Sequence, residues 1–266
     1  MIATLKGSRL LLLAAAVAVL EGCGGGHSGG SGAVTPTGDV TPAGVWQGGF
    51  TATDGITRGF DLIVAPDGLF VGVVASSGLN GRFLIGNGDT TLNAFTATGT
   101  VFAQAGEAVL PNGQASGALT VSDGNIVAGA SLKGNYSGAG ESASFSLAYS
   151  DALTSRGASL DAVKGIYSVY PPITLNDMTL VISGSTLTFA TDGGCNGAGN
   201  ISVIDPAVNM YAWSMLLSAC GGEDGDMFSG LATLADNPRQ NGHGNLIALY
   251  GATENHDRSF VFRGYK

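Results

Sequence analysis

Two histidines with acidic neighbours are the residues of this sequence best placed for acid-base or metal chemistry. His243 and His256 lie on either side of a predicted strand, with Glu254 and Asp257 beside His256. Loops at one end of a β-barrel converge, so a site could be assembled from these side chains. Solvated loop histidines are the commoner meaning of such a pair, and the remaining histidine, His27, lies in a glycine-rich segment. We therefore assign no catalytic residue and predict a protein that is not an enzyme.

A second candidate for chemistry is an acidic run directly after Cys220. Glu223, Asp224 and Asp226 offer carboxylate oxygens, which are the ligands that calcium prefers. The run lacks the spacing of an EF-hand loop, and charged residues on a turn are mostly just solvated. We expect no metal and no cofactor.

Aromatic residues at period two offer a possible sugar-binding face. Tyr211, Trp213 and Tyr250 are the candidates. Aromatic residues at every second position are also typical of a strand whose inner face fills a core, and we favour this interpretation. Two catalytic-looking matches near the N-terminus, G-x-S-x-G and G-x-G-x-x-G within residues 24–30, are discounted because both patterns need a strand before them and a helix after them.

The composition excludes several classes of protein. Glycine accounts for 44 of 266 residues, more than twice its usual share of about 7 %, and charged residues for 12 % against a usual share of about 25 %. Hydrophobic residues stand at 44 %, so disorder through lack of core material is not expected. A net charge of −9 with 11 scattered basic residues argues against a nucleic-acid partner.

The N-terminus has the pattern of a secretory signal peptide. Lys6 and Arg9 precede the apolar run Leu10–Leu20, which is too short to span a bilayer. The following residues, Leu20 to Cys23, resemble the lipobox of bacterial lipoproteins, although Glu21 departs from the small residue usual there. This resemblance implies cleavage after residue 22 and lipidation of Cys23. The alternative is an ordinary secreted protein in which Cys23 is a free thiol.

The resemblance also implies a location. The partner of such an anchor is a membrane, and several acyl chains make a durable attachment. Gly24 stands where some lipoproteins carry the aspartate that retains them at the inner membrane, so the resemblance favours the outer membrane of the cell envelope. Residues 23–41 are rich in glycine, serine and proline and are expected to form a flexible tether.

Cysteine counting then predicts a disulfide. The chain has three cysteines, and removing the lipidated Cys23 leaves Cys195 and Cys220 as a pair. A zinc site would need further ligands near these two thiols, and the sequence offers none of the right kind there.

The rest of the chain predicts two all-β modules, each an antiparallel up-and-down β-barrel of about eight strands. Short alternating apolar runs are separated by turn residues, and barrel closure removes exposed sheet edges. Pro66-Asp67-Gly68 and Asp123-Gly124 are predicted hairpin turns. The strands of the first half are expected at 45–52, 59–65, 69–76, 82–86, 95–103, 114–121, 125–133 and 142–150. Those of the second are expected at 165–170, 178–183, 186–191, 199–204, 209–217, 227–234, 245–251 and 259–265.

Both halves open in the same way, which predicts an internal duplication. Gly44-Val45-Trp46 in the first half corresponds to Gly165-Ile166-Tyr167 in the second. Between them, Ser159 to Lys164 has the capping residues of a short helix. The predicted organisation is a signal peptide (1–22), a lipidated tether (23–41), a first module (42–150), a linker with a short helix (151–164) and a second module (165–266).

The opening triplet resembles that of calycins, the lipocalins and their relatives. In that group the first strand carries Gly-x-Trp and the last strand brings an arginine over the ring. The resemblance places Trp46 and Tyr167 in this role and Arg263 as the covering arginine of the second module. The alternative is that each aromatic residue simply begins a strand and packs in a core, with no relation to that group. Separately, Gly194-Cys195-Asn196 with Cys220 faintly resembles META domains of bacterial envelope proteins.

These observations predict a lipid-anchored envelope protein with a non-enzymatic binding function. Its partner would be an unidentified small molecule, protein or glycan. The alternative is a structural or adhesive surface lipoprotein whose solid barrels contact proteins or glycans. A ligand carrier needs an interior cavity of roughly 300 Å³ or more, so the interior discriminates between the two. We further expect the modules to unfold as separate cooperative units.

Overall fold

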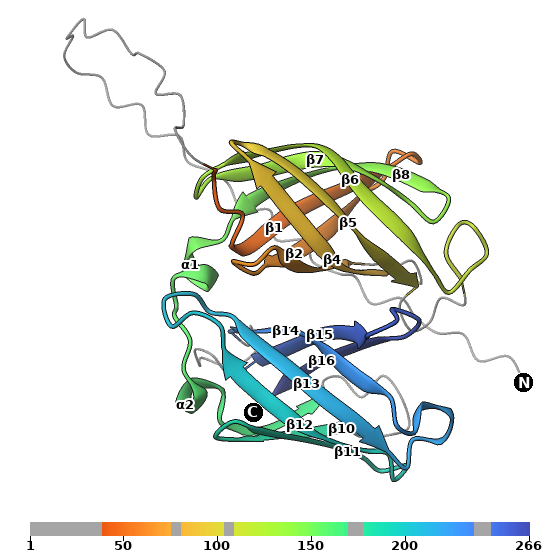
Figure 1. Ribbon diagram of the computed structural model, residues 1–266, viewed down its shortest axis with the longest axis vertical. Coiled ribbons are helices and arrows are strands. Elements are labelled where there is room, and N and C mark those ends of the chain that lie inside the picture. The colour runs from red at the N-terminus through yellow and green to blue at the C-terminus, as the bar shows by residue number, and fades with distance from the viewer. Residues whose placement is uncertain (1–38, 76–80, 104–108, 170–177, 237–245) are drawn as a thin grey trace, which may run out of the picture. The chain divides into compact units, whose positions relative to one another are not determined.

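The protein is described by a computed structural model that covers residues 39–75, 81–103, 109–169, 178–236 and 246–266. These residues form two consecutive closed barrels of eight antiparallel strands each, and every strand pairs with its neighbours in sequence order (Figure 1). The predicted all-β fold of two up-and-down barrels is confirmed. The proposed signal peptide, Cys23, His27 and His243 lie outside the described residues.

The first barrel is closed by pairing of its first and last strands, Trp46 opposite Tyr149. Its strands are β1 (Gly44–Ala52), β2 (Thr57–Val64), β3 (Leu69–Val74), β4 (Arg82–Thr91), β5 (Ala94–Ala103), β6 (Ser116–Val127), β7 (Ser131–Gly138) and β8 (Glu141–Tyr149).

The second barrel has a shorter closing seam, in which Gly264 and Tyr265 face Val169 and Ser168. Its strands are β9 (Gly165–Val169), β10 (Met178–Ser183), β11 (Thr186–Thr191), β12 (Asn196–Val203), β13 (Tyr211–Ser218), β14 (Met227–Ala235), β15 (Leu246–Thr253) and β16 (Ser259–Tyr265). Two short helices, α1 (Asp151–Thr154) and α2 (Leu160–Val163), join the barrels, and a 3₁₀ turn, η1 (Gly221–Glu223), follows β13.

Strand alternation fills each barrel with its own core. In β1, Trp46 and Phe50 point inward and belong to a cluster that also contains Phe60 and Phe145. A separate cluster, which includes Tyr167 of β9, fills the second barrel. Inward apolar and outward polar residues at period two are what a closed antiparallel sheet requires.

One predicted hairpin turn is present and the other is wrong. Gly68, with φ +91°, turns the chain between β2 and β3 as predicted. Asp123 and Gly124 lie inside β6, where the register shifts between Ser122 and Asn125. This is a β-bulge: Asp123 takes a left-handed φ of 52° and Gly124 packs against the Phe95 backbone. The turn falls instead at residues 128–130, so β7 begins six residues later than expected.

The two opening triplets take equivalent positions. Trp46 Nε1 donates to the carbonyl of Pro42 at 2.8 Å, and the Tyr167 hydroxyl donates to the carbonyl of Val163 at 2.8 Å. In each case the acceptor lies four residues before the buried aromatic residue. The predicted correspondence of the two halves is therefore present in the local hydrogen bonding.

The prediction that Arg263 covers Tyr167 is wrong. Arg263 lies on the outer face of β16, where its Nε donates to the Tyr250 hydroxyl at 2.9 Å. The cation over the Tyr167 ring is Lys266, whose Nζ lies 5.6 Å from the ring centroid. Strand alternation explains the difference, because Arg263 follows the inward-facing Phe262.

The linker between the barrels holds the predicted short helix and a buried threonine. Ser159 caps α2 by accepting from the Ala162 N–H. Thr154, at the end of α1, accepts from the Val45 N–H through its hydroxyl at 3.0 Å and from the Asn209 N–H through its carbonyl at 3.0 Å. Thr154 therefore connects the first strand of one barrel with the β12–β13 loop of the other.

The outer faces of the two barrels share a third apolar cluster. Phe83 on β4 stacks on Tyr250 of β15 with ring centroids 6.4 Å apart. Asp61 Oδ2 of the first barrel lies 3.7 Å from Arg263 Nη2 of the second. The buried members are Ile63, Ala65, Val71, Val73, Phe83, Ile85 and Phe102 from the first barrel and Met210, Leu231, Ala248, Tyr250 and Ala252 from the second. The barrels share no strand, but they do share buried apolar surface.

Candidate functional site

Barrel topology assigns every loop of the first barrel to one of two ends. The turns β2–β3, β4–β5 and β6–β7 lie at the end where β1 begins, which we call the base. The connections β1–β2, β3–β4, β5–β6 and β7–β8 lie at the opposite end, which we call the mouth. A strand of nine residues is about 30 Å long and tilts by roughly 35–45° in a barrel, so the two ends lie about 20–25 Å apart.

The mouth contains a pocket of about 400 Å³. It combines an apolar floor with charged walls, in a chain where charge is scarce. The lining residues are Phe50, Ala52, Thr53, Asp54, Arg58, Val74, Arg82, Val109, Leu110, Pro111, Gly140 and Glu141.

Two ion pairs form the charged walls. Arg58 contacts Asp54 across the β1–β2 hairpin, with Nη2 2.7 Å from the carboxylate oxygen. Arg82, at the start of β4, has its Nη2 3.4 Å from Glu141 at the start of β8, and both side chains are largely buried. The Arg58 guanidinium and then the Ile56 N–H lower the pKa of the Asp54 carboxyl below its usual value. The mouth therefore presents both signs of charge in fixed positions.

Beneath the pocket the barrel is almost solid. Phe50 lies on the floor of the mouth pocket and also borders an interior void of about 20 Å³, which is close to the space of one water molecule. Edge-to-face contacts of Phe50 with Phe60 and Tyr136 and of Phe60 with Phe145 fill this region. A drug-sized ligand needs about 300 Å³ or more, so this void is too small to hold one.

Tyr136 joins the interior to the charged wall. Its ring packs on Phe50 with centroids 5.2 Å apart. Burial raises the pKa of the Tyr136 hydroxyl, the nearby Glu141 raises it further, and Arg82 opposes the rise. The hydroxyl therefore stays protonated at neutral pH.

The histidine group of the sequence does not come together as a site among the described residues. His256 Nδ1 lies 3.3 Å from the hydroxyl of Thr100 on the first barrel. Asp257 accepts from the Thr253 hydroxyl at 2.7 Å, and this bond above all lowers the pKa of its carboxyl. Within the described part of the chain there is no group of three or more potential metal-ligating side chains.

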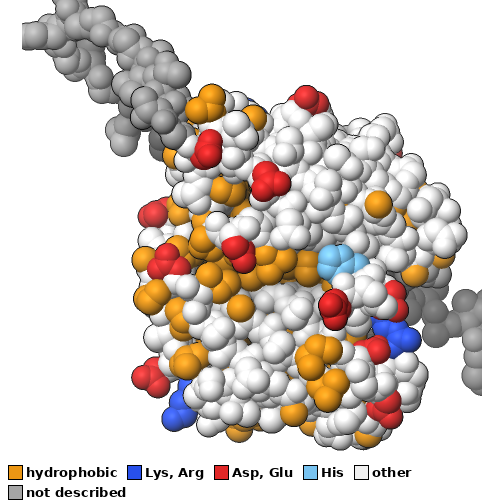
Figure 2. Space-filling model, in the orientation of Figure 1, with side chains coloured by type: hydrophobic (Ala, Val, Ile, Leu, Met, Phe, Trp, Pro, Cys, Tyr) orange, Lys and Arg blue, Asp and Glu red, His pale blue; other side chains and the backbone are white. Residues whose placement is uncertain are grey.

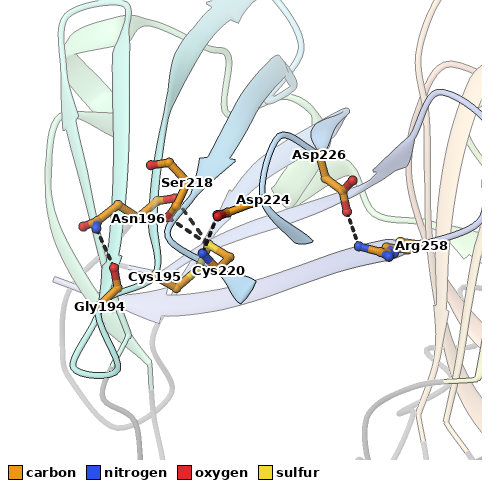
Figure 3. Close-up of a disulfide and its surroundings, with 8 residues drawn as sticks. All are labelled: Gly194, Cys195, Asn196, Ser218, Cys220, Asp224, Asp226 and Arg258. Atoms are coloured by element: carbon orange, nitrogen blue, oxygen red, sulfur yellow. Dashed lines mark hydrogen bonds and ion pairs between the residues drawn. A yellow bond between two sulfur atoms is a disulfide. The ribbon is translucent and has the colours of Figure 1, made fainter. Parts of the chain in front are cut away.

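The acidic run and the disulfide lie together where β13 ends and β14 begins in the second barrel (Figure 3). Cys195 and Cys220 are joined, with Cα atoms 4.3 Å apart, as the cysteine count predicted. Asp224 accepts from the Cys220 N–H at 2.7 Å, and Asp226 pairs with Arg258. The carboxylates of Asp224 and Asp226 thus hold the loop in shape.

The candidate aromatic residues do not form a sugar-binding face. Tyr211 and Trp213 point into the second barrel, and Trp213 Nε1 donates to the Leu231 carbonyl at 3.1 Å. Tyr250 lies in the cluster between the barrels. The core interpretation of the period-two pattern is confirmed for Tyr211 and Trp213.

The mouth residues were not identified from the sequence, although the positions of their charges relative to the expected strands pointed to them. Asp54 and Arg58 fall between the expected strands 45–52 and 59–65, and Arg82 and Glu141 begin strands that start at the same end of an up-and-down barrel. On the face shown in Figure 2, acidic side chains are scattered over the surface, and a few acidic and basic side chains lie close together at the right-hand edge. Charge gathered at strand ends was therefore the feature to look for.

Comparison of the chain with models of known protein families, with curated proteins and with solved structures found no match. Among the described residues, none of the helices has the length and apolar character needed to cross a bilayer.

Proposed function

We propose that this protein is a lipid-anchored, non-enzymatic binding protein of the outer membrane, which contacts a protein or glycan with the mouth of its first barrel. The anchor is Cys23, on the strength of the lipobox-like residues that precede it. The observation that carries the binding function is the mouth pocket, where Arg58–Asp54 and Arg82–Glu141 stand over an apolar floor.

The packed interior favours a macromolecular partner over an enclosed small molecule. A void of about 20 Å³ leaves no room for a ligand inside the first barrel. A small molecule seated in the mouth is the second candidate, because about 400 Å³ lies within the range of ligand pockets. The calycin-like character of the modules belongs to this proposal and is supported by the equivalent bonding of Trp46 and Tyr167.

The experiment uses the full chain with Cys23→Ser, which is expected to be soluble, and measures its binding to envelope fragments from the source cells. Saturable binding is expected. The paired change Asp54→Asn with Arg58→Met removes one ion pair without leaving a lone charge and should weaken binding about tenfold, a loss typical of a central contact.

A matched control changes the second barrel. Ile166→Thr on β9, which alters a side chain that is 63 % exposed, should leave binding to envelope fragments unchanged. Binding that is insensitive to the Asp54/Arg58 change, or equally sensitive to the control, would contradict a site at the mouth. Native mass spectrometry of protein purified from its source distinguishes the candidates, because a co-purifying small molecule supports the second one.

A further inference from the structure

The base of the first barrel exposes two apolar side chains next to each other. Leu92, in the β4–β5 turn, is 47 % exposed, and Val127, at the end of β6, is 52 % exposed. The Ile126 N–H donates to the Asn93 carbonyl at 2.8 Å, which fastens the two turns together. The pair therefore forms one small apolar surface, which we call the base patch.

The N-terminal segment of the described chain is fastened to the same turn. The Leu92 N–H donates to the Asp39 carboxylate at 2.7 Å, and the Val40 N–H donates to the Leu92 carbonyl at 2.8 Å. The first described residues, Asp39 and Val40, therefore lie against the base patch.

Leucine is an unusual residue for the conformation that Leu92 adopts. Its φ of 57° lies in the left-handed region, which a branched side chain rarely takes. The two other base turns place glycine at such positions, Gly68 with φ +91° and Gly129 with φ +60°. Glycine would suit the backbone better at residue 92, so the apolar side chain needs another explanation.

We propose that the base patch rests on the surface of a zwitterionic lipid bilayer, with Leu92 and Val127 among the lipid headgroups. This proposal rests on the lipid anchor at Cys23. Asp39 follows Cys23 by 16 positions in the sequence, a length of chain that spans at most about 55 Å even when fully extended. An anchored barrel is therefore held at high effective concentration next to the bilayer, where even a small contact sets its orientation.

The charges around the base select the kind of lipid. Four exposed carboxylates lie at this end, those of Asp39, Asp67, Asp89 and Asp151. Lys133, on β7 near the same end, carries a positive charge. An anionic surface would repel these carboxylates, whereas zwitterionic headgroups would not. In this orientation the mouth points away from the membrane, about 20–25 Å from the base.

The test measures amide hydrogen exchange in the lipidated full chain on phosphatidylcholine vesicles, against the Cys23→Ser chain with the same vesicles. Amides of residues 91–93 and 127–130 should exchange on the order of tenfold more slowly in the anchored protein. The β1–β2 hairpin at the mouth should exchange equally in both. Protection should fall when phosphatidylglycerol replaces part of the lipid, and a rise would overturn the proposal.

Two variants separate the patch from the anchor. Leu92→Gly with Val127→Thr relieves the backbone of residue 92 and should keep the protein on the vesicles while abolishing the protection of the base. Ile56→Thr, which changes a side chain at the mouth that is 52 % exposed, should leave the protection intact. Equal exchange at the base with and without the anchor, or protection that survives in the double variant, would overturn the proposal alone. A chain that carries no lipid at Cys23 would overturn the proposed anchor as well.

Discussion

Tyr136 links the packed interior of the first barrel to the charged mouth, and its titration reports on that environment. Burial, followed by the effect of Glu141, raises the pKa of its hydroxyl above the usual 10.0. The folded state therefore holds this proton more tightly than the unfolded state. The corresponding contribution to stability is complete below pH 10 and is lost as the pH rises above that value.

We expect the free energy of unfolding to decline above pH 10, and Tyr136→Phe to make this decline shallower. Denaturant unfolding between pH 8 and pH 11, followed by circular dichroism, measures both. The hydroxyl donates a long bond to the Gly138 carbonyl at 3.4 Å, and losing so weak a contact should let the variant fold normally. Identical pH profiles for the two proteins would contradict the buried environment assigned to Tyr136.

Sequence patterns located most of the strands because closed antiparallel sheets impose strict alternation on both halves. The runs at 178–183, 186–191 and 259–265 match β10, β11 and β16 residue for residue. The patterns failed where backbone geometry outweighs alternation, as at Asp123, where a bulge inside β6 carries the Asp-Gly pair usual for a hairpin.

The candidate site was harder to predict than the strands. Arg58 and Glu141 are 83 positions apart, and only the pairing order of the barrel brings their strand ends together. Arg263 was misplaced for a different reason. The calycin pattern suggested that it covers Tyr167, whereas strand alternation places its side chain on the outer face of β16. Spatial clusters of this kind follow from register, which composition does not specify.

The β6 bulge makes a sharp prediction about glycine. A Cβ on Gly124 would lie 2.1 Å from the Phe95 carbonyl oxygen, which is backbone and cannot move aside easily. Gly124→Ala should therefore lower the free energy of unfolding by about 3 kcal/mol.

The matched control is Gly129→Ala in the β6–β7 turn, where nothing lies within 4 Å. Its positive φ alone should limit the cost to about 1 kcal/mol. Equal losses for the two variants in urea titrations would show that the bulge is not where the structure places it.

The disulfide holds the end of the second barrel that carries the acidic loop. It closes a loop with a sequence separation of 25 residues, for which chain entropy gives about 3–4 kcal/mol. The double change Cys195→Ala with Cys220→Ala should lower the free energy of unfolding of the full chain by about that amount, as measured in guanidinium chloride. Finding both thiols free in protein from its source would contradict the pairing.

At the scale of the whole molecule, the cluster between the barrels changes the expectation of independent halves. Phe83 and Tyr250 are both buried there, although each lies on the outer face of its barrel. Cutting the chain between residues 150 and 151 would expose these faces to water and separate Val45 from Thr154. Exposed apolar patches of this kind promote aggregation, so we now expect each half alone to be poorly soluble or only marginally stable.

Packing of the two barrels against each other through this cluster is the central claim, and differential scanning calorimetry tests it directly. A chain spanning residues 39–266 should unfold in a single transition whose calorimetric and van't Hoff enthalpies agree. Phe83→Ser, which places a hydroxyl in the cluster while leaving both interiors intact, should lower that transition or split it. Two separate transitions in the unaltered chain, each matching an isolated half and neither affected by Phe83→Ser, would contradict the account.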